Sequence, residues 1–383
     1  MTTMNDLFIE YLASIEPYSK AVKRARVAHD SLREDLEADA NLGPRMLNSF
    51  LSGSYGRSTS IKGIKDVDII IPLDYTFAEL LEFCKPGESV QYCLLRLVRE
   101  AIERSGRHVE SSTIRRRSIL VKLIDDVNGI VDDEPELTLD IVPVIPQINA
   151  AGLADQYSDP LWIADKDLRQ WLWTYPNSQL ADSEKRNAES SYIVDRRHFK
   201  PLVKIMKAWK KVHFGGQKTP KGFFLECMVA EFHNPQAISW LFAVRDMLKN
   251  VCDAWGNPDY FTSSPTVADI SKSSPNRVPL VKYEKPEDLD RAKNIVKKMR
   301  RHLELINQAI EEATFDLYKA AQTLQIVFGA DPDDICFQLP ERQEADRSNS
   351  GSNAVVHSGV IRPVVTITSP NRLWGYDEPG IDS

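Results

Sequence analysis

The sequence predicts an α+β fold, with a mixed sheet and helices in the first half of the chain and a helical domain after it. Three apolar runs of strand length support the sheet, at residues 67–71, 118–124 and 137–144. After about residue 175 no further series of strand-like runs is found, and apolar residues recur at helical spacing instead. The helices expected there are residues 196–214, 222–233, 237–252 and 287–328.

Helical periodicity is also present in the first half. Residues 4–38 lack glycine and contain one proline, Pro17, so we expect a helix that is kinked there. Residues 76–105 are also predicted to be helical. The length of 383 residues favours two domains. We predict a core with an N-terminal helix at 1–175, a helical domain closing a cleft over it at 176–338, and a flexible linker and tail at 339–383.

The composition excludes several classes of protein. With 42% hydrophobic and 27% charged residues, the chain is typical of a folded globular protein. Its formal net charge of -7 argues against a surface built to hold nucleic acid, so we expect no obligatory nucleic-acid partner. There is no signal pattern and no apolar run of membrane-span length, and the five cysteines are widely spaced. These features predict free thiols, no membrane partner and a cytoplasmic location.

A glycine-serine turn precedes the first predicted strand, in the string LSGSYGR from Leu51 to Arg57. Such a turn exposes backbone N–H groups and a hydroxyl to an anion. Glycine allows the anion to approach closely because it has no side chain. We therefore expect Gly53, Ser54 and Arg57 to bind the phosphates of a substrate.

Three aspartates lie on the predicted strands. Asp66 and Asp68 flank Val67, and because strand side chains alternate, both carboxylates point away from the core that Val67 enters. Asp140 lies in a later apolar strand, where an unpaired carboxylate is costly to bury. A lone Asp-x-Asp is more often a surface turn, but the three carboxylates with the glycine-serine turn favour a site for Mg²⁺ or Mn²⁺. Paired ions of this kind activate a hydroxyl and stabilise a leaving pyrophosphate, so Asp66, Asp68 and Asp140 are the predicted catalytic and metal-binding residues.

The strings GSYGRSTSIKGIKDVDIIIPL and LTLDIVPVIP resemble the polymerase-β superfamily. Within it they are similar to the nucleotidyltransferases that include oligoadenylate synthetase, cyclic GMP-AMP synthase and bacterial relatives that make cyclic oligonucleotide signals in antiphage defence. The resemblance covers about residues 1–330. It implies a polymerase-β-type core, nucleoside triphosphate substrates (ATP and/or GTP), and a cyclic di- or trinucleotide product that activates a separate effector.

A lysine-rich helix is predicted in the second half, where the lysines at 200, 204, 207 and 211 share one face. One interpretation is a solvated, charged face on a core helix. The other is that these crowded charges repel one another unless an anion such as a triphosphate relieves them. In the family the corresponding helix turns a lysine toward the donor phosphates, so the resemblance implies that Lys207, with Lys204 one turn away, binds substrate.

Gly222 stands where the family often has a serine that assists the same phosphates. The resemblance therefore marks Gly222 as a substrate-binding position that lacks the hydroxyl. A backbone N–H, Lys218 or Thr219 could take over that contact.

Three consecutive arginines, Arg115 to Arg117, precede the second predicted strand. Two interpretations stay open for them: a surface basic cluster, which we prefer, or a contact with an acceptor nucleotide.

Two other functions are compatible with the same residues. One is a transferase that adds nucleotides to RNA or to a protein partner, and the other is a non-catalytic nucleotide-binding protein. The acidic charge balance and the lack of a recognisable RNA-binding module argue against the first, and the presence of all three carboxylates argues against the second. The tail is expected to contribute little to the site and to contact a protein regulator.

Overall fold

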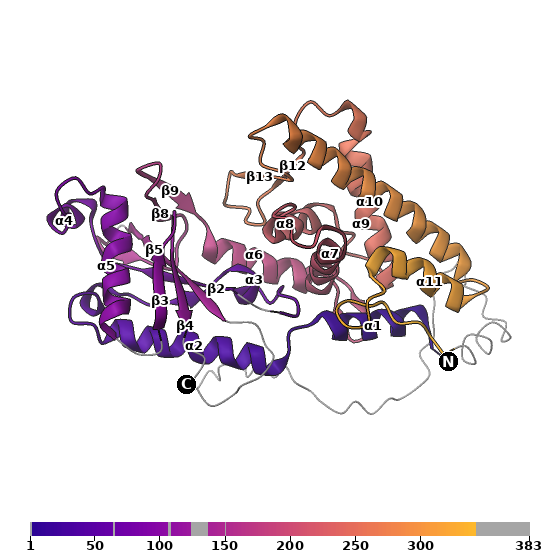
Figure 1. Ribbon diagram of the computed structural model, residues 1–383, viewed down its shortest axis with the longest axis horizontal. Coiled ribbons are helices and arrows are strands. Elements are labelled where there is room, and N and C mark those ends of the chain that lie inside the picture. The colour runs from indigo at the N-terminus through magenta and orange to yellow at the C-terminus, as the bar shows by residue number, and fades with distance from the viewer. Residues whose placement is uncertain (1, 64–65, 106–108, 124–136, 150, 342–383) are drawn as a thin grey trace.

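The computed structural model describes residues 2–63, 66–105, 109–123, 137–149 and 151–341 (Figure 1). Nearly all of the predicted linker and tail lies outside the described residues. The helices are α1 (Met4–Ile15), α2 (Ser19–Glu37), α3 (Gly53–Gly56), α4 (Phe77–Glu82), α5 (Val90–Ser105), α6 (Pro176–Glu189), α7 (Phe199–Phe214), α8 (Gly222–Phe232), α9 (Trp240–Trp255), α10 (Pro286–Glu312) and α11 (Leu317–Phe328). The strands are β1 (Phe50–Leu51), β2 (Asp66–Pro72), β3 (Val109–Ile114), β4 (Ile119–Leu123), β5 (Thr138–Ile145), β6 (Gln147–Ile148), β7 (Ala154–Asp155), β8 (Leu161–Asp165), β9 (Gln170–Thr174), β10 (Tyr192–Ile193), β11 (Arg196–Arg197), β12 (Thr266–Ala268) and β13 (Arg277–Pro279).

A mixed sheet forms the first part of the molecule. Its strands follow the order β1-β2-β5-β4-β3, and β8 pairs with the C-terminal end of β5 and with β9. β2 and β5 are parallel, whereas the other pairings in this sheet are antiparallel. The predicted α+β class, a mixed sheet with a helical region, is confirmed. The structure adds β3, the hairpin β8-β9 and α6, which the sequence patterns did not reveal.

The two faces of this sheet have different environments. Val67 and Ile69 of β2 are buried with side chains of α2 and α5 in one hydrophobic core. Asp66 and Asp68 alternate with them and so lie on the opposite face. Further along that face Ile70 belongs to a small separate apolar cluster. The sheet is thus held by one face and presents carboxylates on the other.

A second hydrophobic core is built from α7 to α11 and from α1. Phe8 of α1 is fully buried and packs edge-on against Phe328 and Phe337, with ring centroids 5.5 and 5.1 Å away. The hydroxyl of Tyr11 donates a hydrogen bond to the carbonyl oxygen of Phe328 over 3.2 Å. Figure 1 shows α1 beside α7 and α11, away from the sheet.

The break predicted at Pro17 is also the point where the chain changes core. α1 ends at Ile15 and packs with the helices, whereas α2 begins at Ser19 and packs with α5 on the sheet. The sequence placed the whole N-terminal helix with the sheet; the structure buries α1 elsewhere, because its apolar face meets aromatic rings from the far end of the chain. The domain limits near residues 175 and 338 remain predictions.

Two segments predicted as single helices are each divided. The segment 76–105 forms α4 and α5, with Pro86 and Gly87 in the connection between them. The segment 287–328 forms α10 and α11, and the side chain of Asp316 caps α11 by accepting a hydrogen bond from the N–H of Lys319.

Replacing Phe8 with alanine should lower the free energy of unfolding by about 3–5 kcal/mol, because the ring is fully buried between two other rings. Chemical denaturation followed by circular dichroism measures the change. Phe315→Ala is the matched control, since Phe315 is 59% exposed, and its effect should stay within about 0.5 kcal/mol. Equal effects of the two substitutions would show that α1 does not hold the second core together.

Candidate active site

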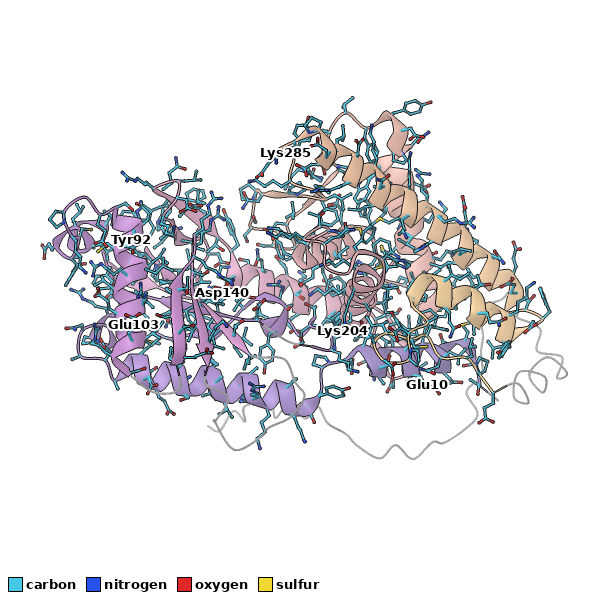
Figure 2. All side chains as sticks on the ribbon, in the orientation of Figure 1. Glu10, Tyr92, Glu103, Asp140, Lys204 and Lys285 are labelled. Atoms are coloured by element: carbon cyan, nitrogen blue, oxygen red, sulfur yellow. The ribbon has the colours of Figure 1, made fainter. Side chains whose placement is uncertain are left out.

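Asp68 and Asp140 lie side by side on neighbouring parallel strands. The register of β2 and β5 pairs Asp68 with Asp140, and Asp66 with Thr138. The hydroxyl of Thr138 donates a hydrogen bond to Oδ1 of Asp66 over 2.5 Å. Paired positions on adjacent strands face the same way, so the three predicted carboxylates share the sheet face opposite α5. Figure 2 labels Asp140 on this sheet.

Gly53 lies directly over the side chain of Asp68. Its φ of +61° is in the left-handed region, and a Cβ at this position would fall 1.8 Å from Oδ2 of Asp68. The N–H of Ser52 also donates a hydrogen bond to the carbonyl oxygen of Asp68 over 2.9 Å. Glycine is therefore required between the turn and the carboxylate, and a ligand bound at the turn lies next to Asp68.

The turn after Gly53 is fixed by backbone hydrogen bonds. The N–H of Gly56 donates to the carbonyl oxygen of Ser52, and the N–H of Thr59 donates to that of Ser54, each over 2.9 Å. The hydroxyl of Ser54 has no hydrogen-bond partner among the residues that the structure describes. This hydroxyl is therefore available to a ligand at the turn.

The carboxylate face carries an excess of negative charge. Burial, together with the nearby charge of Asp140, raises the pKa of Asp68 to about 6. Burial also raises the pKa of Asp140, although a hydrogen bond from Ser118 and the charge of Arg115 oppose it. Oδ1 of Asp140 is buried and accepts no hydrogen bond within the described part of the chain. An unsatisfied oxygen beside a second crowded carboxylate fits a divalent cation with oxygen ligands.

A buried carboxylate, Glu226, joins the glycine-serine turn to the helices. Its Oε2 accepts a hydrogen bond from Nε of Arg57 over 2.7 Å, and its Oε1 accepts one from Nζ of Lys207 over 2.6 Å. Burial opposes ionisation, but the charges of Lys207 and Arg57 hold the pKa of Glu226 down to about 2. Nζ of Lys207 also donates to the carbonyl oxygen of Thr59 over 3.0 Å, and Phe223 covers the guanidinium of Arg57 at 5.3 Å. The structure thus brings Arg57 and Lys207 together beneath the turn.

Each of the four lysines on the predicted face of α7, at positions 200, 204, 207 and 211, has a carboxylate partner. The premise that these lysine charges need a bound anion to offset their repulsion is therefore wrong, because acidic residues from separate segments neutralise them. Nζ of Lys204, a residue labelled in Figure 2, lies 3.1 Å from Oε1 of Glu16, which follows α1. A phosphate contact for Lys204 remains a prediction. The other pairs are Lys200 with Glu184, Lys207 with Glu226 and Lys211 with Asp334.

Comparisons with known proteins identify relatives of the chain. Residues 1–187 match the model of the Second Messenger Oligonucleotide or Dinucleotide Synthetase domain. A curated protein of an Acinetobacter species, named cyclic AMP-AMP-AMP synthase, is 30% identical over 264 residues, which make up 67% of this chain and 66% of that protein. The chain belongs to this synthetase family. A probable cyclic AMP-AMP-GMP nucleotide synthase of Salmonella paratyphi B is 23% identical over 304 residues, 70% of this chain and 77% of that protein.

Solved structures of bacterial relatives share the fold. The CdnC protein in the E. coli CdnC:HORMA-deltaN complex superposes with a TM-score of 0.60 at 14% identity, covering 85% of this chain and 98% of that one. CdnG of Bradyrhizobium diazoefficiens, in complex with GTP, gives a TM-score of 0.60 at 12% identity, covering 85% of this chain and 95% of that one. At such identities the likeness shows the fold alone. Within the described ranges, no helix has the length and apolar character that a membrane crossing would need.

Gly222, whose substrate-binding role remains a prediction, begins α8 and lies beside Lys207. A Cβ at Gly222 would be 3.6 Å from Cε of Lys207, an ordinary contact. The missing side chain is therefore not demanded by packing. The side chain of Lys207 is nevertheless buried, with 9% of its surface exposed.

The three consecutive arginines separate into two groups. Arg116 and Arg117 both donate hydrogen bonds to Asp165, each with a distance of 2.8 Å to Oδ2, and the side chain of Asp165 is fully buried. Arg115 instead points its guanidinium at Asp140, with Nη1 at 3.8 Å from Oδ2. All three arginines are exposed, as the preferred interpretation of a surface cluster expects, and a contact of Arg115 with an acceptor nucleotide stays open.

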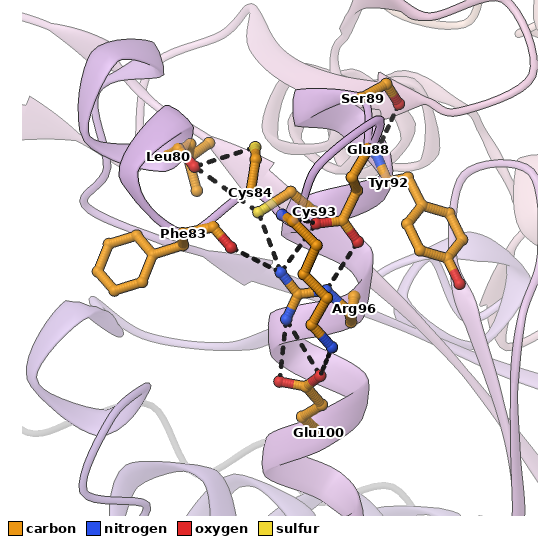
Figure 3. A network of polar contacts seen from close by, with 10 residues as sticks. Leu80, Phe83, Cys84, Glu88, Ser89, Tyr92, Cys93, Arg96 and Glu100 are labelled. Atoms are coloured by element: carbon orange, nitrogen blue, oxygen red, sulfur yellow. Dashed lines mark hydrogen bonds and ion pairs between the residues drawn. The ribbon is translucent and has the colours of Figure 1, made fainter.

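A second group of potential ligands lies at the junction of α4 and α5 (Figure 3). The ligand atoms of Cys84, Glu88 and Cys93 all lie within 4.8 Å of one another, the one such group of three found among the described residues. Arg96 holds both oxygens of Glu88, at 2.7 and 2.9 Å, and its Nη2 is 3.5 Å from Sγ of Cys93. Its guanidinium already supplies the positive charge, so a metal ion is disfavoured there.

Asp68→Asn should stabilise the fold at pH 7 in the presence of a chelator. A raised carboxyl pKa means that the folded state favours the protonated form, so the contribution of Asp68 to the stability of the wild type falls as the pH rises from about 4 to 6. The neutral amide removes this cost, and the gain should be roughly 1–3 kcal/mol at pH 7 and disappear near pH 4. Thermal unfolding at several pH values measures it. Asp74→Asn, at an exposed position, is the control and should change little; a destabilised Asp68→Asn would contradict the proposed crowding.

Proposed function

We propose that this chain is a nucleotidyltransferase that joins nucleoside triphosphates, ATP and/or GTP, into a cyclic di- or trinucleotide and releases pyrophosphate. The observation that carries the proposal is the pairing of Asp68 with Asp140 directly beneath Gly53. This arrangement places a turn that can bind phosphates next to carboxylates that can bind a cation. Attack of a hydroxyl on a phosphorus atom needs both features close together. The names of the Acinetobacter and Salmonella relatives support cyclisation and ATP as the first substrate to test.

Binding of the donor nucleotide is assigned to the glycine-serine turn. Backbone N–H groups at Gly53 and the unpartnered hydroxyl of Ser54 contact its phosphates. Lys207 approaches them from beneath, between Thr59 and the open position at Gly222. Arg57 acts less directly, because Glu226 and Phe223 enclose its guanidinium; it fixes the turn and adds positive potential.

The divalent ion, Mg²⁺ or Mn²⁺, would be held by Asp66, Asp68 and Asp140, and it would supply positive charge to the phosphates and to the leaving pyrophosphate. The unsatisfied Oδ1 of Asp140 and the raised pKa of Asp68 support this assignment. Because the carboxylates must be ionised to bind a cation, affinity should fall as the pH drops below about 6.

In the proposed reaction, a ribose hydroxyl of the acceptor forms a bond to the α-phosphorus of the donor. The bond from that phosphorus to the bridging oxygen breaks, and pyrophosphate leaves with its electrons. The hydroxyl proton passes to the carboxylate of Asp140 and from there to solvent. A carboxylate with a free, buried oxygen and a raised pKa is suited to accept it.

The proposed function includes a cellular location, a downstream effector and a protein regulator. We place the enzyme in the cytoplasm, where its product activates a separate effector in bacterial antiphage signalling. The CdnC relative was solved with HORMA-deltaN, which supports a protein regulator as a partner. The tail after residue 341 is our candidate for that contact.

The product assay separates this proposal from its alternative. Purified protein is incubated with Mg²⁺ and all four labelled triphosphates, with and without RNA or DNA, and the products are treated with phosphatase. We expect a product that survives, since a cyclic oligonucleotide has no terminal phosphate, and stimulation by either polymer below about ten-fold, since the chain is acidic. Label appearing on RNA or on protein would favour the alternative transferase.

Asp140→Asn should separate binding from chemistry. Gly53, Ser54 and Lys207 stay in place, so affinity for a non-hydrolysable donor triphosphate should change by less than about ten-fold, or about 1.4 kcal/mol. Turnover should fall by orders of magnitude, because Asp140 acts mainly in the transition state. Titration calorimetry and product assays measure the two quantities. A folded variant that turns over at nearly the wild-type rate would remove Asp140 from the mechanism.

A further inference from the structure

The turn between β3 and β4 is attached rigidly to the hairpin β8-β9. Two arginines hold one buried carboxylate there, since Arg116 and Arg117 both bind Asp165. The N–H of Lys166 donates to the carbonyl oxygen of Arg116 over 3.1 Å, and the N–H of Leu168 caps Oδ1 of Asp165 over 3.0 Å. Of the three consecutive arginines, Arg116 and Arg117 thus help to position the turn through their Nε atoms.

Arg115 is the remaining member, and the same turn aims it at the active site. Its N–H donates to the carbonyl oxygen of Ser118 over 2.8 Å, which fixes its backbone. Its guanidinium lies 3.8 Å from Oδ2 of Asp140, too long for a hydrogen bond, and the side chain is 49% exposed. An exposed ion pair of this kind is weak, so the guanidinium can turn to a more highly charged anion without loss of a strong contact.

The position of Arg115 relative to Asp140 identifies that anion. If Asp140 accepts the proton of the acceptor's hydroxyl, the acceptor's ribose lies against Asp140, and its own 5′ phosphates are one ribose away. The donor phosphates are assigned to the turn at Gly53, beneath which Lys207 and Arg57 already lie. Arg115 approaches Asp140 from the turn between β3 and β4, which lies on the other side of β5 from β2 and Asp68.

We propose that Arg115 binds the 5′ phosphates of the acceptor nucleotide and so positions its hydroxyl at Asp140. The inference rests on the proposed function, because it requires an acceptor nucleotide. A guanidinium matches phosphate oxygens with two parallel N–H groups, which fixes orientation as well as charge.

The test uses substrates that each play a single role. The donor is 2′,3′-dideoxy-ATP labelled at the α-phosphate, which has no hydroxyl to accept. The acceptor is either α,β-methylene-ATP, which cannot donate its α-phosphate, or adenosine, which has no phosphate. Arg115→Gln should lower kcat/KM for α,β-methylene-ATP by about 10- to 100-fold, the effect of losing a charge-assisted contact, and leave that for adenosine within about three-fold.

Two further variants sharpen the result. Arg115→Lys keeps the charge and should recover part of the loss. Arg301→Gln removes the same charge from an exposed position on α10 and should leave both acceptors unchanged. Equal losses with both acceptors would overturn the inference and assign Arg115 to the structure of the turn, and so would no loss with either. If the wild type makes no product with any acceptor, the proposed function itself fails, and this inference with it.

Discussion

The contact on which the site most depends is the buried group of Arg57, Glu226 and Lys207. Glu226 comes from α8 in the helical core, Lys207 from α7, and Arg57 from the end of the turn that covers the sheet. One carboxylate, 1% exposed, therefore ties the phosphate-binding turn to the second core. Breaking a buried, hydrogen-bonded ion pair by removing one partner is costly, typically about 3–5 kcal/mol, so the two cores are constrained to meet at the turn. The position of Lys207 beneath Ser54 and Thr59 follows from this constraint.

The sheet contributes a destabilising arrangement to the same site. Parallel pairing of β2 with β5 fixes Asp68 beside Asp140, and Gly53 closes over Asp68 so tightly that no side chain fits. Burial and, after it, the charge of Asp140 raise the pKa of Asp68, so holding these carboxylates ionised here costs free energy. A fold selected for stability alone would replace one of them. Their retention, beneath a turn with an unpartnered hydroxyl, is understandable where a cation and phosphates offset the repulsion, and stability is then given up locally for binding.

The sequence was informative where the chemistry depends on local alternation. The alternation of side chains along a strand was enough to predict that Asp66 and Asp68 share a face opposite Val67. The effect of proline on a helix was enough to predict the break at Pro17. The lysines of α7 could not be interpreted in this way, because their carboxylate partners come from residues 16, 184, 226 and 334. Glu226 was overlooked for the same reason; its one sequence signal is an acidic residue inside the apolar run from Phe223 to Ala230. The allocation of α1 to the second core likewise depends on aromatic residues more than 300 positions away.

Local charge balance distinguishes the two groups of potential metal ligands in the described structure. At the junction of α4 and α5, Glu88 and Glu100 face Arg96, and Lys85 also reaches Glu100, so two negative charges meet two positive ones (Figure 3). On the sheet, three aspartates share one face, and the one cation that an ion pair joins to them is Arg115, 3.8 Å from Asp140. Arg57 lies close enough to affect Asp68 but is committed to Glu226. The short distances between ligand atoms would by themselves favour the junction of α4 and α5 as the metal site. The excess of negative charge instead favours the aspartates. Since cation binding is driven by that excess, the aspartates are the group that a divalent ion would complete.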